Sequence, residues 1–494
     1  MGHANSASTS SIDVLIIGAG PVGLFLANEC ARRSLRWRIV EQRPRQSEHS
    51  KALAVMPRTL EIFDMAGIVA PFLETANRVT SVAVVTHGHR LAQIPFAPPD
   101  TPYPFVAMVP QDVTEALLVQ ALRSRGGAVE YETSFVSASQ DGDGVDVVLD
   151  RRGERVTVRA AFVVGCDGAH SAVRHQLGLP FEGAAYDATF MLADIDTNET
   201  LRGDELQLCP HEDGPLAIFP MSSRRRRIVA TVDKSDGDAP TLEHVRSVLA
   251  QRAPRGLEAR SLNWSSYFRI QHRQVAHMQD GRIFVAGDAA HIHSPFGGQG
   301  MNTGLHDAWN LAWKLDLAIR HRARPELLES YTAEREPVIR DVIETTDLFT
   351  RALGTASRFA QGLRDVVIPL VSRLAPFRYR FVQRISELGV DYHGSAMVEG
   401  PGHRYFDESL RGGRGISSRF VLLVGADDES ETAAEARRLA DDYRNVLELR
   451  SGAQAGIALV RPDGYTAYEA YRGAPSAALE SVREVLERQV VGST

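Results

Sequence analysis

A glycine-rich stretch near the N-terminus constrains the fold more than any other feature of this chain. Residues 14–17 form an apolar, β-branched run typical of a buried strand, and "GAGPVG" (residues 18–23) follows it directly. A second strand-like stretch at residues 37–40 ends at Glu41. This order of strand, glycine turn, helix, strand and acid predicts a parallel α/β unit that binds a dinucleotide.

Each residue of this pattern has a physical role. Gly18 allows a tight turn, Gly20 lets the backbone approach a pyrophosphate, and Gly23 lets the helix pack closely on the strand. The free N–H groups at the start of a helix favour phosphate, and Glu41 can accept hydrogen bonds from a ribose. A tight turn without a ligand is the alternative, and this motif alone does not distinguish FAD from NAD.

Two later stretches follow the same logic. A strand at residues 162–165 leads to an Asp167-Gly168 turn and a helix that carries Arg174. Another strand ends at Gly287-Asp288 and precedes a glycine-rich loop and a helix. The glycines in and near this loop are Gly281, Gly287, Gly297, Gly298, Gly300 and Gly304. They predict a backbone that passes close to a flat or charged ligand. The helix has apolar residues at helical spacing, namely Leu305, Ala308, Trp309, Ala312 and Leu315, which predicts an amphipathic helix.

Together the three motifs resemble those of single-component FAD-dependent aromatic hydroxylases, the flavoprotein monooxygenases of the p-hydroxybenzoate hydroxylase fold. The resemblance spans nearly the whole chain. It implies that Asp288 binds the ribityl chain and that backbone N–H groups of residues 300–302 bind the flavin pyrimidine edge. Lys51 stands where many relatives carry arginine, and lysine lacks the planar fork of that side chain. The implied FAD contacts are Gly18, Gly20, Gly23, Glu41, Arg43, Lys51, Gln111, Asp167, Arg174, Asp288, Gly300, Met301 and Asn302.

The resemblance also implies the reaction. NADPH or NADH, bound transiently, would reduce FAD, and O2 would form a flavin C4a-hydroperoxide that hydroxylates a phenolic or polycyclic aromatic substrate, polyketides included. Pro295 and Gly298 would line the oxygen and flavin pocket. No acid–base residue is assigned, since His211, Tyr267 and His272 are better explained as packing residues. A flavin-dependent reductase or dehydrogenase of the same fold and a non-catalytic flavin-binding module stay open as alternatives.

The predicted fold class is α/β, a Rossmann-like FAD-binding domain with an inserted β-sheet substrate domain and a thioredoxin-like C-terminal domain. The predicted ranges are 1–75, 102–180 and 272–345 for FAD binding, 76–101 and 181–271 for the substrate sheet, 346–399 for a helical connector and 400–494 for the C-terminal domain. We expect the arginine run at residues 224–227 to be a solvated loop rather than an anion site. We also expect the basic helices of the connector to pack on the flavin domain rather than on a membrane.

Composition excludes several other classes of protein. A net charge of −7 argues against a protein that neutralises phosphate backbones, so no nucleic acid is expected as a partner. No stretch approaches the roughly 20 apolar residues of a membrane span, and the polar N-terminus lacks the pattern of a signal peptide. Cys30, Cys166 and Cys209 are too few and too far apart for a disulfide framework or a metal site. We therefore predict a cytoplasmic enzyme for a small aromatic substrate, with a homodimer as a candidate assembly.

Overall fold

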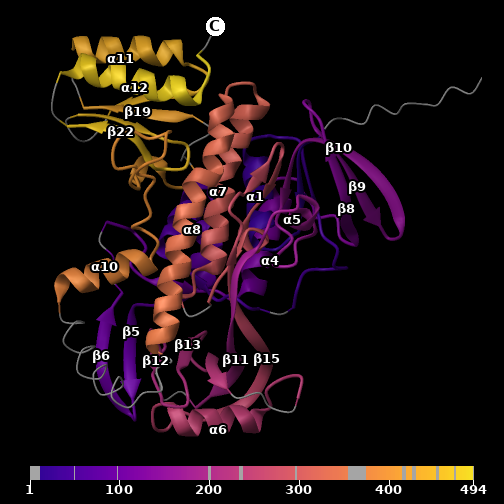
Figure 1. The fold of residues 1–494 in the computed structure, drawn as a ribbon. Coiled ribbons are helices and arrows are strands. Elements are labelled where there is room, and N and C mark those ends of the chain that lie inside the picture. Colours follow the sequence, from indigo (N-terminus) through magenta and orange to yellow (C-terminus); the bar gives the residue numbers. More distant parts are fainter. Residues whose placement is uncertain are drawn as a thin grey trace, which may run out of the picture.

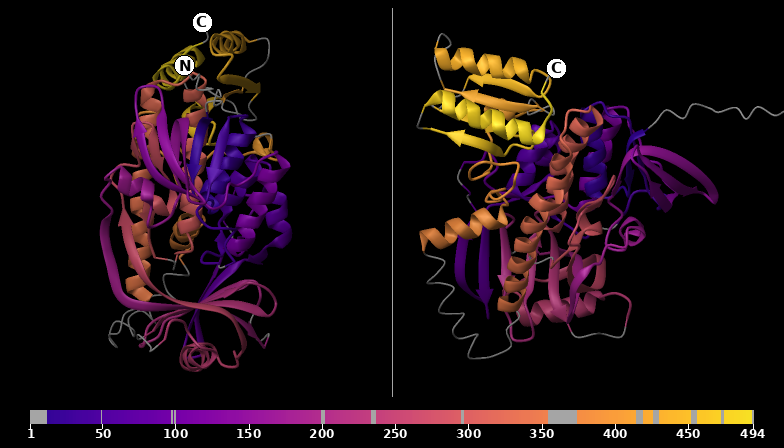
Figure 2. Two further views of the ribbon diagram at one scale, coloured as in Figure 1. Left: turned by 90° about the vertical axis from the view of Figure 1, so that its right-hand side faces the viewer. Right: turned by 45° about the horizontal axis from the view of Figure 1, so that its top comes forward.

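The structure is a computed structural model. It describes residues 12–48, 50–96, 98, 100–198, 202–232, 237–294, 297–353, 374–413, 419–425, 430–451, 456–471 and 474–492. Within these residues the strands form sheets of seven, eight, four and three strands. The four-stranded sheet lies at one end of the molecule and the eight-stranded sheet at the other, with two long helices running between them (Figures 1 and 2).

The seven-stranded sheet contains the glycine turn and the strands that precede the other two motifs. Its parallel core has the order β17-β10-β1-β2, and β8 and β9 extend it as an antiparallel arm. The strands are β1 (Ile12–Ile17), β2 (Trp37–Val40), β8 (Thr133–Gln140), β9 (Val145–Arg151), β10 (Glu154–Gly165), β16 (Gln279–Asp280) and β17 (Ile283–Val285). β1 is buried from its second residue onward, as expected of a parallel strand inside an α/β sheet.

Helices pack around this sheet, and α1 contacts both α4 and α7. They are α1 (Pro21–Arg32), α2 (Pro57–Met65), α3 (Val69–Thr75), α4 (Gln111–Ser124), α5 (Ala172–Gln176), α7 (Gly300–Ile319) and α8 (Pro325–Leu353). The prediction that α7 is packed is confirmed, but the exposed polar face of an amphipathic helix is absent, because every residue from Asn302 to Leu317 is buried. α7 packs against α1 and α8, and its second half enters the core of the C-terminal sheet.

The eight-stranded sheet joins the two segments that were predicted to form one inserted sheet. β5 from the first segment pairs with β12 from the second, in the order β18-β15-β11-β14-β13-β12-β5-β6. Its strands are β5 (Ser81–Thr86), β6 (His89–Pro95), β11 (Glu182–Thr197), β12 (Glu205–Cys209), β13 (Leu216–Pro220), β14 (Arg225–Val232), β15 (Ala259–Gln274) and β18 (His291–Ile292). The domain boundaries themselves stay a prediction.

The two faces of this sheet have different partners. Residues that alternate along its strands contribute to two separate cores, for example Ala230 to one and Val229 to the other. The first core includes α6 (Leu242–Arg252). The second contains the three-stranded sheet of β3 (Ala54–Val55), β7 (Val106–Met108) and β4 (Asn77–Val79), together with α10 (Ala375–Ile385).

The C-terminal unit is a four-stranded sheet with two helices, seen at the upper left of Figure 1. β19 and β20 pair in parallel around α11, and β21 and β22 form an antiparallel hairpin that leads to α12. The elements are β19 (Phe420–Val424), α11 (Glu431–Asp442), β20 (Leu447–Ser451), β21 (Ile457–Val460), β22 (Thr466–Ala470) and α12 (Pro475–Gln489). Its core shares Trp313 and Leu317 of α7 and Leu327 of α8, so this unit and the two long helices have one continuous core.

A cluster of buried charges fastens the C-terminal unit to the long helices. Arg461 makes two hydrogen bonds to Glu334 of α8, at 2.6 and 2.8 Å, and two to Asp463, at 2.7 and 3.1 Å. Lys314 of α7 donates to the same Glu334 at 2.8 Å. These side chains are at most 1% exposed, and burial lowers the pKa of Lys314 to about 8. The charges compensate one another, so the cluster depends on all of its members.

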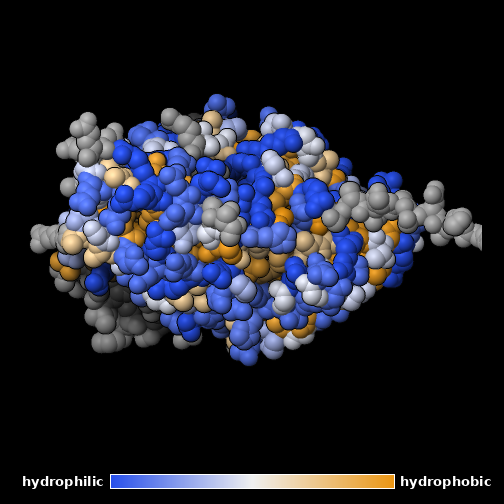
Figure 3. All heavy atoms as spheres, turned by 90° about the horizontal axis from the view of Figure 1, so that it is seen from above, coloured by the Kyte–Doolittle hydropathy of each residue, from blue (hydrophilic) through white to orange (hydrophobic). Residues whose placement is uncertain are grey.

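The face of the molecule seen in Figure 3 is mainly hydrophilic, and apolar atoms show mostly between hydrophilic ones. Among the described residues, no helix combines the length and the apolar character needed to cross a membrane. α10 is the described element of the basic connector beyond α8, and Phe377 and Tyr379 on it are exposed. Residues 354–373 of the predicted connector lie outside the described residues.

Candidate active site

Three loops that are far apart in the sequence meet at one edge of the parallel strands. β1, β10 and β17 run in the same direction, so the chain leaves them at the same edge. A Cβ built on Gly18 would lie 2.5 Å from the carbonyl oxygen of Cys166, and one built on Gly287 would lie 2.8 Å from Val22. The three motifs therefore form one site, at the carboxyl edge where open α/β sheets bind ligands.

The glycines of the first loop differ in what surrounds them. A Cβ on Gly23 would lie 2.0 Å from the carbonyl oxygen of Gly18, and Gly18 itself has a positive φ of 101°. A Cβ on Gly20 would meet nothing within 4 Å. Gly20 is the N-cap of α1, with Pro21 in the first turn and no side-chain cap. The fold requires Gly18 and Gly23, whereas Gly20 leaves open space beside uncapped amides, which fits a diphosphate.

Glu41 lies where β2 ends and is 6% exposed. Its Oε2 accepts a hydrogen bond of 2.9 Å from the Ala19 amide, and its Oε1 accepts bonds of 3.0 Å from the backbone and side chain of Arg43. Burial acts to raise the pKa of Glu41, but the bonds from Arg43 and Ala19 outweigh it and lower that pKa. Glu41 is thus an ionised acceptor beside the glycine turn, as a ribose-binding acid must be.

We expect Glu41→Ala to weaken FAD binding by roughly 1.5–3 kcal/mol, the range of a charge-assisted hydrogen bond. The reason is the loss of the acceptor and of the charge that orders Arg43. Titration of the apoprotein with FAD measures the effect. Glu132→Ala is the control, since Glu132 pairs with Arg152 on the antiparallel arm. Unchanged affinity for FAD in Glu41→Ala would assign the ribose contact to another residue.

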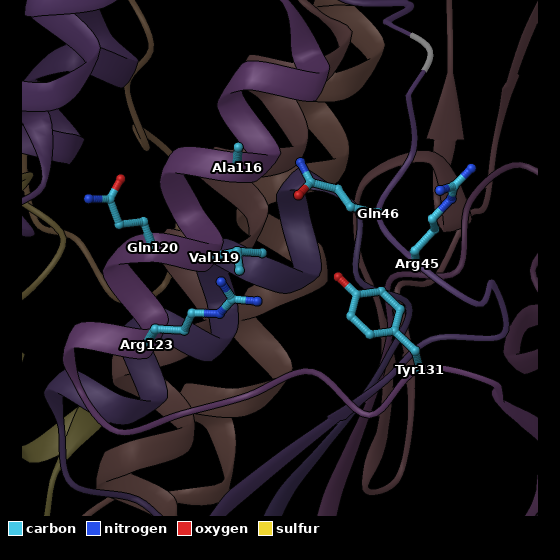
Figure 4. A pocket seen from close by; sticks show the side chains of 7 residues that line it. All are labelled: Arg45, Gln46, Ala116, Val119, Gln120, Arg123 and Tyr131. Carbon is cyan, nitrogen blue, oxygen red and sulfur yellow. The ribbon is translucent and has the colours of Figure 1, made fainter.

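A solvent-open cavity of about 480 Å³ lies beside this end of the site (Figure 4). It is lined by α4, by Tyr131 and by Arg45 and Gln46, which follow Arg43 in the chain. The side chains of Arg123 and Tyr131 project toward its middle, while Arg45 extends away from it. The Glu41 amide donates to the carbonyl oxygen of Glu130 at 2.9 Å, and Glu130 precedes Tyr131, so this cavity lies next to the predicted ribose site.

The second loop is built around Asp167 and Arg174. Asp167 accepts hydrogen bonds from the first amides of α5, at 2.7 and 3.2 Å. Arg174 is 3% exposed and donates to the carbonyl oxygens of Ala169 and Ala289, at 2.8 and 3.0 Å. Its guanidinium lies 3.9 Å from the ring centre of Phe181. Arg174 therefore ties the second loop to the third, and its contact with a cofactor stays a prediction.

The third loop is held from behind by a buried acid. Asp307 of α7 accepts hydrogen bonds from the Gly287 amide at 3.0 Å, from His291 at 2.7 Å and from Arg335 at 2.7 Å. Burial alone would raise the pKa of Asp307. The opposing effects of Arg335 and His291 are together larger, so the pKa is lowered. Asp288 is exposed at the open edge.

Sequence reasoning missed Asp307, His291 and Arg335. The sequence did contain a signal for Asp307. It is an acidic residue among the apolar residues of a helix that directly follows a glycine-rich loop. A charged residue in such surroundings is fully buried only when it has partners. Its partners lie on β18 and α8, and the sequence does not specify that contact.

The start of α7 is open to a ligand. Its N-cap, Gln299, makes no side-chain hydrogen bond to the first turn, so the amides of residues 300–302 have no cap from that side chain. The side chain of Asn302 is fully buried and faces the other way. It accepts from the Met56 amide at 2.9 Å and donates to the carbonyl oxygen of Ala54 at 2.9 Å. Asn302 thereby fixes the helix start to β3, and the predicted flavin contact would use its backbone.

The segment before β3 is held by side chains from α4 and β14. Gln111, the first residue of α4, accepts from the Ala52 amide at 3.1 Å. Arg227 of β14 makes two bonds of 2.8 Å to Asp194 and donates to the carbonyl oxygens of Lys51 and Ala52, at 3.0 and 3.1 Å. The Lys51 side chain itself is exposed. These contacts hold residues 51–52 between the two larger sheets.

The prediction of a solvated loop at residues 224–227 is wrong for half of that run. Arg224 and Arg225 are exposed, but Arg226 and Arg227 are 1% and 2% exposed. The reason is that β14 begins at Arg225, so the later arginines lie within the sheet and find internal acceptors. The sequence shows that four arginines are consecutive, but it does not show which of them a strand will bury.

The glycines around the third loop fall into two groups: some allow protein elements to pack closely, whereas Gly298 borders a cavity. Cβ atoms on Gly281, Gly287 and Gly304 would collide with protein, at 2.4 Å from Gln140 and at 2.8 and 2.7 Å from Val22. The prediction that these glycines make room for a ligand is therefore wrong, since they allow close packing of protein elements. Gly298 has a φ of 65° and borders Ala54 and Met56 at 3.3 Å. Pro295 lies outside the described residues.

Gly298 also borders an apolar cavity. Its walls come from β3 and β7, from the face of the eight-stranded sheet opposite α6, from residues 297–299, and from Phe381 and Ile385 of α10. Among the described residues that line it, Gln299 alone is polar and none is charged. Its apolar walls favour an uncharged ligand over a charged one, and its volume in this structure is about 60 Å³.

Of the three candidates for acid–base work, none lines this cavity. The Tyr267 hydroxyl lies 2.8 Å from the ring nitrogen of His244 on α6, so Tyr267 belongs to the opposite face of the sheet. His211 lies beside Asp213, with 3.4 Å between ring nitrogen and carboxylate oxygen. The interpretation of Tyr267 as a packing residue agrees with its place in that core.

The fold and the site define an α/β protein built to hold a flavin dinucleotide, and comparisons with known proteins agree. The family described as FAD binding domain matches residues 11–346. The 6-methylpretetramide 4-monooxygenase of Streptomyces rimosus is 34% identical, over 93% of this chain and 91% of its own. The pentachlorophenol 4-monooxygenase of Sphingobium chlorophenolicum is 28% identical, over 91% of this chain and 86% of its own.

A solved structure shows the same architecture. OxyS anhydrotetracycline hydroxylase from Streptomyces rimosus superposes with a TM-score of 0.77 at 29% identity, covering 97% of this chain and 99% of its own. The mixed α/β arrangement of sheets described above is thus that of FAD-binding aromatic hydroxylases. The chain belongs to the FAD-binding-domain family of flavoprotein monooxygenases.

Proposed function

We propose that this chain is an FAD-dependent, NAD(P)H-consuming monooxygenase that hydroxylates a neutral phenolic or polycyclic aromatic substrate. The observation that carries the proposal is the position of the apolar cavity. Gly298 and Gln299, directly before the uncapped start of α7, form part of its wall. A ring in this cavity would therefore lie beside the helix start that is predicted to bind the flavin.

The residues of the site fit FAD, and each has a stated part in the proposal. The open space at Gly20 and the uncapped amides of α1 would take the diphosphate, and Glu41 would take the adenosine ribose. Asp288 would bind the ribityl chain, and the amides of residues 300–302 would bind the pyrimidine edge. When bound, FAD would supply the redox chemistry, which is hydride acceptance from NADPH or NADH and activation of O2.

The protein's own contribution is orientation and exclusion of water. With the flavin bound as proposed, the positive end of α7 would face the part of the reduced cofactor that carries negative charge and would stabilise that charge. The apolar walls keep water from the reaction, and Phe381 and Ile385 close the cavity on the side of α10. None of the described lining residues is charged, so ring position would be set by shape more than by ion pairing.

Labelled oxygen tests the proposal. The purified holoenzyme is incubated with NADPH or NADH, 18-O2 and a panel of phenols and polycyclic aromatic polyketides, and the products are analysed by mass spectrometry. We expect one 18-O atom per hydroxylated product. Substrate conversion without labelled oxygen would instead indicate a reductase or dehydrogenase of this fold. Flavin binding with no conversion of any aromatic would favour the non-catalytic module.

We expect Gly298→Ala to uncouple the reaction. The new Cβ would press on Ala54 and Met56, and the positive φ adds about 1–2 kcal/mol of backbone strain. A displaced wall admits water, so NAD(P)H oxidation should continue while more of its electrons appear as hydrogen peroxide. The ratio of peroxide to nicotinamide consumed, at saturating FAD, measures this effect.

Gly126→Ala is the matched control for backbone strain. Gly126 also has a positive φ, of 79°, but a Cβ there would meet nothing within 4 Å. It should lose some stability and keep the coupling of the parent. Equal peroxide ratios in Gly298→Ala and the parent would place the oxygen chemistry away from this loop.

The thioredoxin-like character of the C-terminal unit is part of the proposal. The order of β19, α11 and β20, then a hairpin and α12, supports it. Since Cys209 is the last cysteine of the chain, this unit would serve packing and not dithiol exchange. The shared core with α7 and α8 agrees with that role.

A further inference from the structure

The C-terminal end of α10 is fastened by three contacts to the start of α7 and the start of α2. The Gln299 side chain donates to the carbonyl oxygen of Arg384 at 3.0 Å. The Arg58 amide at the start of α2 donates to the carbonyl oxygen of Ser386 at 3.2 Å. Glu387, the next residue, lies with its Oε1 3.2 Å from the hydroxyl of Thr303 in the first turn of α7. Phe381 and Ile385 on the same helix line the apolar cavity and form its α10 wall. The anchor therefore sets the position of that wall.

Glu387 is held in an unusual position. It is 3% exposed and its backbone has a φ of 59°, in the left-handed region that residues with a Cβ seldom adopt. Its Oε2 is buried and makes no hydrogen bond to the described residues. The nearest ring nitrogen, Nε2 of His306, is 3.5 Å away and interacts with the hydroxyl of Thr59 at 3.0 Å. Strain of this kind persists where the surrounding structure holds a side chain in place.

Counting hydrogens indicates the protonation state of Glu387. The Thr303 hydroxyl has a single hydrogen but two oxygen neighbours, the carbonyl of Gln299 at 3.1 Å and Oε1 of Glu387 at 3.2 Å. An ionised Glu387 would place two acceptors against one donor. With a proton on Oε1, Glu387 donates to Thr303 and Thr303 donates to Gln299. The neutral acid therefore satisfies both contacts, and the carboxylate satisfies one.

Burial keeps Glu387 neutral. It raises the pKa of Glu387 to about 8, although the hydrogen bond with Thr303 and the charge of Arg335 on α8 both lower that pKa; the charge of Asp307 on α7 raises it. Arg335 donates to Asp307 and not to Glu387. Burial, together with the positive charges of Arg335 and of Arg58 on α2, lowers the pKa of His306 well below its ordinary value. At neutral pH Glu387 and His306 are therefore both uncharged, and the contact between them is not an ion pair.

We propose that Glu387 is a positioning residue that works as a neutral acid, whose proton closes the contact to Thr303 and holds the α10 wall against the start of α7. Loss of that proton leaves a buried negative charge with no cation bonded to it and one hydroxyl hydrogen between two acceptors, so the anchor is destabilised and the wall loosens. The protonation state is independent of the proposed function. The effect on hydroxylation rests on the proposed function.

Thermal unfolding from pH 5 to pH 9 tests the protonation state. The folded chain keeps the proton until about pH 8, whereas the unfolded chain releases it near the ordinary value of 4.5. The stability that Glu387 contributes is therefore complete below pH 4.5 and is lost as the pH rises to 8. Glu387→Gln keeps a neutral donor and does not have this loss. The Tm of Glu387→Gln minus that of the parent should increase between pH 5 and pH 8 and then level off.

Glu484→Gln is the matched control, because Glu484 is exposed on α12. Its Tm difference from the parent should not change with pH. A constant difference for Glu387→Gln as well would overturn the proposal, since Glu387 would then titrate like an exposed glutamate. This test needs no turnover, so it decides the protonation state even if the chain hydroxylates nothing.

Coupling tests the positioning role. Peroxide formed per NAD(P)H consumed is measured from pH 6.5 to pH 9 with an aromatic substrate. The parent should uncouple as the pH rises toward 9, where about nine tenths of Glu387 is ionised. Glu387→Gln should stay coupled across the range, and Glu387→Ala should be uncoupled throughout. Loss of coupling in Glu387→Gln at pH 7, or the same alkaline loss as in the parent, would overturn the positioning role.

Discussion

Arg461→Leu should lower the free energy of unfolding by about 3–5 kcal/mol, the usual cost of removing one partner from a buried ion pair. The Glu334 and Asp463 carboxylates would stay buried without the guanidinium that now bonds to both. Leucine cannot replace these hydrogen bonds. The loss should appear as a lower midpoint in chemical denaturation followed by tryptophan fluorescence, because Trp309 and Trp313 both donate to Asp463.

Arg483→Gln provides the matched control in the same unit. Arg483 pairs with Asp442 at 2.9 Å, but both side chains are partly exposed, at 35% and 53%. Pairs of this kind contribute about 0–1 kcal/mol. If Arg461→Leu lost no more stability than Arg483→Gln, the buried cluster would make no net contribution. The C-terminal unit would then depend on its apolar core alone.

Gly20→Val should abolish tight FAD binding while leaving the fold intact. The backbone at Gly20 has ordinary angles (φ −76°), and a Cβ there would meet no protein atom within 4 Å. The branched side chain would instead occupy the space where the diphosphate is proposed to approach α1. Overpacking of this kind costs about 1–3 kcal/mol, and the loss of amide contacts adds to it. FAD titration of the apoprotein measures affinity, and near-ultraviolet circular dichroism measures the fold.

Two other glycines complete this experiment. Gly23→Ala should prevent stable folding, because its Cβ would lie 2.0 Å from the carbonyl oxygen of Gly18. Gly142→Ala should change nothing, because Gly142 also has open space around it and lies in the antiparallel arm. Normal FAD affinity in Gly20→Val would move the diphosphate away from the first loop and would undermine the proposed cofactor site.

The sequence alone determined the features that depend on contiguous residues. The turn at Gly18–Gly23, the acid at Glu41 and the order of the three motifs are local patterns, and their geometry follows from backbone sterics and helix ends. They were sufficient to predict the parallel sheet and the FAD-binding family, which the comparisons confirmed. The individual cofactor contacts stay predictions, and Pro295 lies outside the described residues.

Only the tertiary structure decided which charged residues are buried and what they hold. Arg227, in a run expected to be solvated, reaches the backbone at Lys51, and Asp307 holds Gly287 from behind. Glu387 meets Thr303 across 84 residues of sequence. A buried charge is tolerated only with partners, and these partners come from other elements, so a single sequence does not show them. For the same reason α7 was expected to be amphipathic, since the elements that cover its polar side are distant in the chain.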